Sequence, residues 1–204
     1  MASIAAVAFA TGYFGESASR FLPDERLFGD LWVRPYARVG CCGFVALDAG
    51  GRVVGYVIGA RRPDRYRREL ARLLLTRVLP GLVAQRYRHA RPAARYLARV
   101  LRRRLPGADE ARYPAHLHVN VLREARGAGL GRRLLERHLA CLTASGVPGV
   151  HLSTTSENAA AIRLYERLGF ATVRRTRSDL WRPWLGHDVD HLVMVKDLGR
   201  GGEA

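Results

Sequence analysis

The sequence lacks a long apolar run, and none of its apolar stretches reaches the length that a membrane-spanning helix needs. Residues 1–10 are small and apolar, but no basic leader accompanies them, and Gly12, Gly15 and Glu16 follow soon after. This pattern argues against a signal peptide. We therefore expect a cytoplasmic protein.

Cysteine is scarce. The chain contains Cys41, Cys42 and Cys141, and their spacing matches no metal-binding motif. Adjacent cysteines such as Cys41 and Cys42 are poorly placed to bridge each other. The sequence therefore predicts buried or half-buried thiols and no metal site.

Lysine is almost absent, since Lys196 is the only one, yet arginine is abundant and the formal net charge is +16. Fifteen arginines fall within residues 61–104, against only Asp64 and Glu69. Such a segment could dock nucleic acid or anionic lipid, but a charge run is more often a solvated face. Because the preference for arginine extends over the whole chain, it can reflect coding bias, and we give the charge little weight.

The hydrophobic pattern predicts an α/β fold with a mixed central sheet, in a single domain that spans residues 1–204. Residues 4–9 and 28–36 fit helices, the second limited by Pro35. Residues 43–47 and 52–59 flank a glycine-containing turn, which is typical of a β-hairpin. The remaining pattern alternates strand, helix, strand and helix before two final strands, at 116–122, 129–141, 150–154, 158–168, 171–181 and 191–195. Residues 199–204 fit a frayed tail.

Residues 61–106 differ from the rest, because their leucines recur at helical spacing with arginines on the other face. Pro80 and Gly81 are expected to interrupt the first of these helices. A second amphipathic stretch around residues 96–101 ends near Pro106. The sequence therefore predicts a basic helical insertion between the hairpin and the strand at 116–122.

Three glycines alternate where that strand gives way to a helix, at Gly127, Gly129 and Gly131. Without side chains, their N–H groups can point at one spot, at the positive end of the helix dipole. Arg126 and Arg132 add charge beside it. A pyrophosphate fits this arrangement, but a tight turn without a ligand explains the glycines equally well.

A second motif covers residues 158–170. Asn158 precedes a helix, so its side chain can cap that helix or instead bind a ligand amide. Tyr165 follows two helical turns later on the same face, where ordinary packing is the alternative explanation. Leu164 and Leu168 face elsewhere and suit the core.

These two motifs occur in order, and together they resemble those of the GNAT superfamily of acyl-CoA N-acyltransferases. The shared patterns are Arg-x-x-Gly-x-Gly at 126–131 and Asn-x-x-Ala-x-x-x-Tyr-x-x-x-Gly-Phe at 158–170. The resemblance covers residues 43–58 and about 115–195. More weakly, the whole chain is similar to a bacterial subset of this superfamily and to the acetyltransferase-like modules associated with O-GlcNAcases.

The resemblance implies a GNAT-like sheet, in which an antiparallel hairpin precedes a βαβαβ core, and acetyl-CoA as the acyl donor. The backbone of Val119, Asn120 and Val121 would bind the pantetheine arm where a bulge splays the sheet, and Asn158 would contact the same arm. Tyr165 would lie near the thioester sulfur. The pyrophosphate would be bound by Arg126, Gly127, Ala128, Gly129, Leu130 and Gly131, with Arg132 beside it.

The implied activity is N-acetyltransfer to a primary amine, which attacks acetyl-CoA directly in a ternary complex. Some GNAT enzymes carry a glutamate base on the strand before Asn158, but this chain has Ser153 and Thr154 there. His116 and His118 share one face of the strand at 116–122 and are candidate bases, because free histidine titrates near pH ~6.5. The alternative is that one or both are structural. Tyr165 is the candidate acid for the leaving thiolate.

Other expectations concern the partners. The acceptor could be a small molecule or a peptide, and Asn120, on the same face as the histidines, could orient it. If the insertion walls the acceptor cleft, its arginines would favour a carboxylate or a phosphate on the acceptor. GNAT chains normally begin with a strand, which here is missing or lies upstream. A catalytically silent GNAT fold that binds CoA or a partner is the alternative function, and a homodimer stays open.

Overall fold

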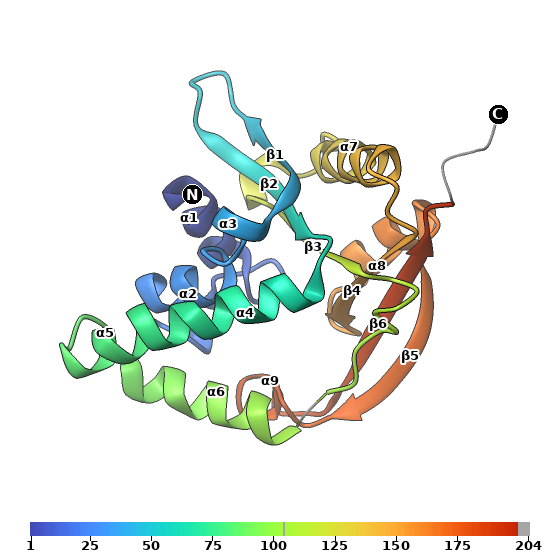
Figure 1. The fold of residues 1–204 in the computed structure, drawn as a ribbon. Helices are drawn as coiled ribbons and strands as arrows, with labels where there is room; N and C mark the ends of the chain where they lie inside the picture. The colour runs from blue at the N-terminus through green and yellow to red at the C-terminus, as the bar shows by residue number, and fades with distance from the viewer. Residues whose placement is uncertain (104, 200–204) are drawn as a thin grey trace.

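The computed structural model describes residues 1–103 and 105–199, which Figure 1 shows as a ribbon. Their six-stranded sheet has the order β1-β2-β3-β4-β6-β5. Among the described strands, β3 and β4 pair in parallel and the other neighbours pair antiparallel, so the predicted mixed sheet is confirmed. The strands are β1 (Cys41–Leu47), β2 (Val53–Ala60), β3 (Ala115–Val121), β4 (Gly149–Thr155), β5 (Ala171–Ser178) and β6 (Val189–Asp197).

The helices lie close to where the hydrophobic period predicts them. The first described strand, β1, follows the helices α1 to α3, and α1 begins at Ala2. Of the tail predicted to fray, only Gly199 lies within the described residues. The helical elements are α1 (Ala2–Thr11), η1 (Ala18–Arg20), α2 (Glu25–Trp32), α3 (Tyr36–Val39), α4 (Pro63–Leu73), η2 (Leu74–Val78), α5 (Leu79–Val83), α6 (Ala90–Arg103), η3 (Arg123–Ala125), α7 (Leu130–Ala144), α8 (Ala159–Arg167) and α9 (Arg182–Leu185).

Each face of the sheet packs against its own set of helices. Along β2, Tyr56 and Ile58 belong to the core that α1 and α2 cover, whereas Val57 belongs to the core under α7. This alternation follows from the pleat, which sends successive side chains to opposite faces. On β3, Leu117 and Val119 belong to the core under α7, so the same rule places His118 and Asn120 on the face of α1 and α2.

The predicted insertion forms an arm of helices between β2 and β3, with α5 at its tip (Figure 1). The expected interruption at Pro80 and Gly81 is wrong, because α4, the π-helical turn η2 and α5 follow one another without a break. Pro80 sits in the first turn of α5, where the π turn adjusts the backbone around a missing N–H donor. A Cβ on Gly81 would lie 2.6 Å from Tyr87, so packing explains the glycine.

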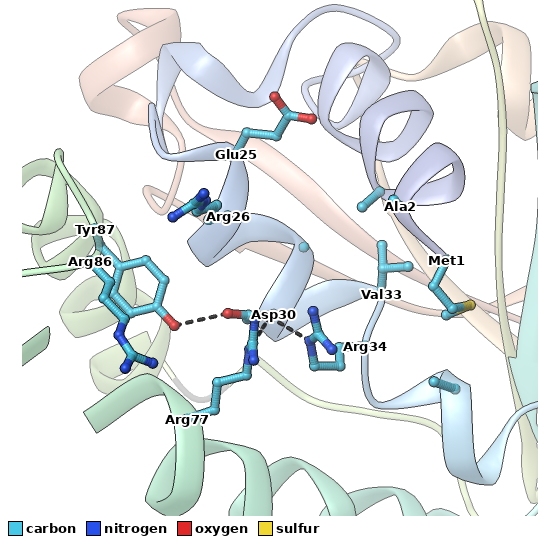
Figure 2. Close-up of a pocket in the computed structure, with 13 residues that line it drawn as sticks. Met1, Ala2, Glu25, Arg26, Asp30, Val33, Arg34, Arg77, Arg86 and Tyr87 are labelled. Carbon is cyan, nitrogen blue, oxygen red and sulfur yellow. Dashed lines mark hydrogen bonds and ion pairs between the residues drawn. The ribbon is translucent and has the colours of Figure 1, made fainter. Parts of the chain in front are cut away.

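A buried carboxylate ties this arm to the body of the protein. Asp30 on α2 is only 3% exposed. It accepts hydrogen bonds from Arg34 Nε at 2.5 Å, Arg77 Nε at 2.7 Å and Tyr87 Oη at 2.9 Å, at the base of a cavity of about 740 Å³ (Figure 2). Arg77 and Tyr87 belong to the insertion, so one acidic side chain fixes the insertion against α2.

A disulfide joins β1 to α7, which corrects the expectation of three thiols. Cys42 and Cys141 are bonded with their Cα atoms 5.7 Å apart. The topology of the sheet brings α7 beside β1, a proximity that no local sequence pattern reveals. Cys41 remains a free, half-buried thiol, and burial raises its pKa. No helix in the described residues is both long and apolar enough to cross a bilayer.

The disulfide predicts the alkylation pattern of protein purified without reductant. After unfolding with iodoacetamide present, one alkylated cysteine is expected by intact mass, and three after reduction. The variant Cys41→Ser should take up no label before reduction, because its other sulfurs are bonded. Three labels on the unreduced wild type would show that Cys42 and Cys141 are not bonded to each other.

The Asp30 carboxylate predicts a local stability effect. Replacing Asp30 with Asn should lower the free energy of unfolding by about 2 kcal/mol, because three donors lose a charged acceptor. The loss is limited because both arginine side chains are nearly half exposed. Asp64→Asn is the matched control, since Asp64 pairs with Arg68 on the same arm but is exposed, and it should cost clearly less stability than Asp30→Asn. Equal losses in urea unfolding would contradict the assigned role.

Candidate functional site

The strands β3 and β4 separate soon after they meet. They pair only at Ala115 with Val150 and at His116 with His151, while β3 stays paired with β2 as far as Val121. Beyond His116, the facing edges of the two strands therefore have no strand partner among the described residues. Unpaired N–H and C=O groups of this kind bind extended chains. The expected splay is present, but the expected bulge is not, since the β2–β3 register is continuous.

A cleft of about 800 Å³ opens where the strands separate. It is lined by His118, Val119 and Asn120 from β3 and by residues 152–155 at the end of β4. Asn158 and Tyr165 line it too, so the structure brings most predicted residues of the second motif and of β3 to one cavity. The opposite wall comes from α1, α2, α6 and the segment after β5.

The glycine turn lies at the N-terminus of α7 and presents free backbone donors. Gly127 and Gly129 have φ angles of 85° and 71°, in the left-handed region that glycine tolerates best. Among the described hydrogen bonds, none uses a backbone N–H of residues 127–132 as donor. The first turn of any helix leaves such donors unpaired, and the helix dipole makes the position favourable for an anion. The turn therefore fits a pyrophosphate.

The glycine turn and the second motif are neighbours in space. A Cβ placed on Gly131 would lie 3.4 Å from Leu164 Cδ2 on α8 and 3.8 Å from Val121 Cγ2 at the end of β3. The first turn of α7 thus packs closely against both elements. Two motifs that are far apart in the sequence therefore flank the end of the open strand edge.

The two arginines predicted beside the pyrophosphate have partners within the protein. Arg126 donates to Val121 O at 3.0 Å and to Gly15 O at 2.7 Å, so its side chain clamps the turn to β3 and to the N-terminal segment. Arg132 pairs with Glu136 on the surface at 2.7 Å. Both guanidinium groups already have protein partners, so the backbone supplies the main contacts available to an anion.

Asn158 and Tyr165 remain available to a ligand. Asn158 precedes α8 but makes no capping hydrogen bond with its side chain. Tyr165 is 7% exposed, and burial raises its pKa to about 12, so the phenol is a neutral donor. Asn120 instead donates to Tyr56 Oη at 2.8 Å, which holds its side chain against β2.

The predicted histidines are neutral at physiological pH. The His118 side chain is exposed to the cleft, and desolvation by the surrounding protein atoms, helped by His151, lowers its pKa to about 4. His116 does not line the cleft; its Nε2 lies 2.8 Å from Tyr36 Oη, and burial lowers its pKa to about 3. His118 is therefore the one of the pair that a substrate can contact.

Two cleft residues escaped the sequence analysis. Thr155 at the end of β4 is 6% exposed, and its hydroxyl has no partner among the described residues. His191 on β6 lies opposite Thr155 in the β4–β6 ladder, and burial lowers its pKa. Neither belongs to a local motif, so only the sheet order could have found them. An orphaned hydroxyl between Asn158 and β3 suits a bound amide.

The cleft is free of formal charge as far as the described lining goes. The insertion does wall it, through Tyr96, Val100 and Leu101 of α6, and no arginine belongs to its described lining. That insertion arginines favour a carboxylate or a phosphate on the acceptor stays a prediction. No three His, Cys, Asp or Glu side chains in residues 1–103 and 105–199 gather so as to hold a metal ion. The absence of a resident metal stays a prediction.

Comparison with known proteins gives a family and several relatives. The model of the Acetyltransferase (GNAT) family matches residues 10–170. A mycothiol acetyltransferase of Nocardiopsis dassonvillei is 51% identical over 53 residues, which are 26% of this chain and 16% of that protein. The ribosomal protein bS18-alanine N-acetyltransferase of Salmonella typhimurium is 53% identical over 69 residues, or 33% of this chain and 44% of that protein. The chain thus matches less than half the length of either relative.

Solved structures resemble the whole fold. The crystal structure of SsHAT superposes with a TM-score of 0.69 at 29% identity, over 97% of this chain and 93% of that one. The Escherichia coli ribosomal-protein-S18-alanine N-acetyltransferase shares the fold with a TM-score of 0.57 at 19% identity, over 98% and 90% of the two chains. The match over residues 10–170 covers most of the sequence, and the chain belongs to the GNAT family of acetyltransferases, which use acetyl-CoA.

Proposed function

We propose that this protein transfers the acetyl group of acetyl-CoA to a primary amine, by direct attack within the cleft between β3 and β4. The observation that carries the proposal is the open strand edge, which has free backbone donors of the glycine turn near one end and the cleft beside it. The extended acetyl-CoA molecule fits along the open edge of β3, and the acceptor amine fits in the cleft.

The residues present suit acetyl-CoA. The N–H groups of residues 127–132 would hold the pyrophosphate at the N-terminus of α7. The pantetheine arm carries amides, which can pair with the free edge of β3 at Val119, Asn120 and Val121 as an added strand does. The side chains of Asn158 and Thr155 supply further polar partners.

The thioester of acetyl-CoA supplies an activated acyl carbon and a sulfur leaving group. As the amine nitrogen bonds to this carbon, the C–S bond breaks and its electron pair leaves on sulfur. Tyr165 would donate a hydrogen bond to that sulfur. With a tyrosine pKa of about 12 and a thiol pKa of ~8.5, complete proton transfer is uphill by roughly 5 kcal/mol, so hydrogen bonding is the main contribution.

His118 is a weak base in this setting. An alkyl ammonium has a pKa of ~10.4, so its proton is held far more tightly than His118 at a pKa of about 4 could hold it. His118 would instead accept a hydrogen bond from the neutral amine. It can take the proton once the N–C bond has formed, because the nitrogen then becomes strongly acidic.

A catalytically silent protein that binds CoA is the second candidate. The observation that favours it is the lack of a carboxylate among the described residues of the cleft. The relatives act on mycothiol or on a ribosomal protein by their names, but they match only 33% of this chain or less. Neither acceptor is therefore carried over, and turnover decides between the two candidates.

The glycine turn gives a test of donor binding with a matched control. Gly129→Glu should weaken acetyl-CoA binding at least about 100-fold in calorimetry. The new carboxylate would repel the pyrophosphate, and a residue with a side chain is strained at the left-handed φ of position 129. Gly146→Glu should bind as the wild type does. Gly146 sits just beyond the other end of α7, also has a positive φ, and has nothing within 4 Å of an added Cβ. Equal affinities for the two variants would overturn the assigned site.

Tyr165→Phe tests turnover itself. The variant should lose about 10- to 100-fold in kcat with little change in KM for acetyl-CoA, because a donor to the leaving sulfur acts mainly in the transition state. Tyr113→Phe should leave kcat unchanged, since Tyr113 is similarly buried but does not line the cleft. Acetyl-CoA binding by the wild type without CoA release from any amine would favour the silent candidate.

A further inference from the structure

One wall of the cleft is built from aromatic rings. It lies opposite β3, along which acetyl-CoA is proposed to bind. The rings pack against one another, with ring centroids 5.0 Å apart for Phe28 and Trp32 and 5.4 Å apart for Tyr96 and Trp181. Phe14 joins them, 5.1 Å from Trp181. These rings come from α2, α6, the segment after α1 and the segment after β5, so the fold gathers them from distant parts of the chain.

Two arginines of α6, Arg99 and Arg103, bond to the segment after β5 and do not line the cleft. Arg99 donates to Asp179 O at 2.5 Å and to Leu180 O at 3.2 Å, and Arg103 pairs with the Asp179 carboxylate at 2.5 Å. These bonds hold α6 against the segment after β5. In a chain with a net charge of +16, the described lining of the cleft still contains no charged side chain.

The lining of the cleft also keeps apolar surface in contact with water. Leu101 is 76% exposed and Val100 is 37% exposed, although both line the cleft. Exposed leucine and valine beside a set of aromatic rings favour contact with an apolar ligand, because burial of such surface is favourable. The donor site does not account for them, since they lie on α6.

We propose that the acceptor is an amine carried on an aromatic group, such as an aralkylamine. The inference rests on the proposed acetyl transfer. The aromatic group would pack against the wall that Trp32 and Trp181 help to form, and the amine would point toward His118 and Asn120 on β3. Rings provide large contact area at little cost in side-chain freedom, and their faces also attract an arriving ammonium.

The same lining would help to deprotonate the amine. Where the described lining of the cleft carries no formal charge, the charged ammonium is disfavoured and its pKa falls. The neutral amine then attacks the acyl carbon with its lone pair, the C–S bonding pair leaves on sulfur, and the nitrogen loses its proton to His118 and then to water. An acceptor with a second charge would find no oppositely charged side chain in the described lining of the cleft.

An acceptor panel tests the proposal through CoA release. Phenethylamine should exceed both glutamate and spermidine in kcat/KM by at least about 100-fold, because each of those carries additional charge for which the described lining of the cleft offers no partner. Trp181→Ala should raise KM for phenethylamine about tenfold while acetyl-CoA binding stays unchanged in calorimetry. Val173→Ala is the control, since Val173 lies on β5, is 56% exposed and does not line the cleft, and it should keep KM.

The outcomes separate this inference from the proposed transfer. A higher kcat/KM for glutamate or spermidine than for phenethylamine would overturn the aromatic acceptor while upholding acetyl transfer. If no amine releases CoA, acetyl transfer is overturned, and calorimetry with CoA present still decides the acceptor class. Binding of phenethylamine in preference to the two charged amines would then uphold the aromatic site, and the reverse preference would overturn it.

Discussion

The parting of β3 and β4 after two residue pairs is the constraint on which the rest of the site depends. A buried backbone group without a partner costs about 1–3 kcal/mol, so an open edge inside a sheet is expensive unless a ligand satisfies it. The Thr155 hydroxyl, which lines the same cleft, is also buried without a hydrogen-bond partner among the described residues. An extended molecule with amides along its length removes this cost, which is why the opening favours a pantetheine arm over a compact ligand.

Contacts on either side keep the opening in place. Arg126 holds the end of β3 to Gly15, and Arg99 holds α6 to the segment that follows β5. The disulfide from Cys42 to Cys141 fixes α7, whose first turn carries the glycines, to the far edge strand. In this arrangement much of the arginine excess is used in structural contacts or left on solvated surfaces. The net charge of the chain therefore says little about the charge that a substrate meets.

The sequence was sufficient for the sheet elements, the glycine turn and the positions of Asn158 and Tyr165, because each leaves a local signature of period or spacing. It was insufficient for the roles of Arg126 and the insertion. Arg126 bonds a carbonyl 111 residues away, and the arginines of α6 bond a segment about 80 residues away. The helix continues past Pro80 through a π turn, which the amino-acid composition does not predict. Contacts between distant segments decide such roles, and the periodicity of one segment does not encode them.

The lining of the cleft explains why the strand before Asn158 carries no glutamate base. A glutamate beside the amine would stabilise the ammonium by charge as well as accept its proton, so it suits acceptors that arrive charged and stay hydrated. An uncharged aromatic wall has the opposite effect, because it destabilises the charged ammonium and so lowers the pKa of the amine before the amine reaches any proton acceptor. The low pKa of His118, about 4, has the same origin, since the enclosure that keeps this ring neutral would also act on an amine bound beside it. The histidine and the amine are then two neutral groups that need only share a hydrogen bond until the N–C bond forms. A strong base is therefore unnecessary where the acceptor is apolar, and the departure from the glutamate pattern fits the lining of the cleft.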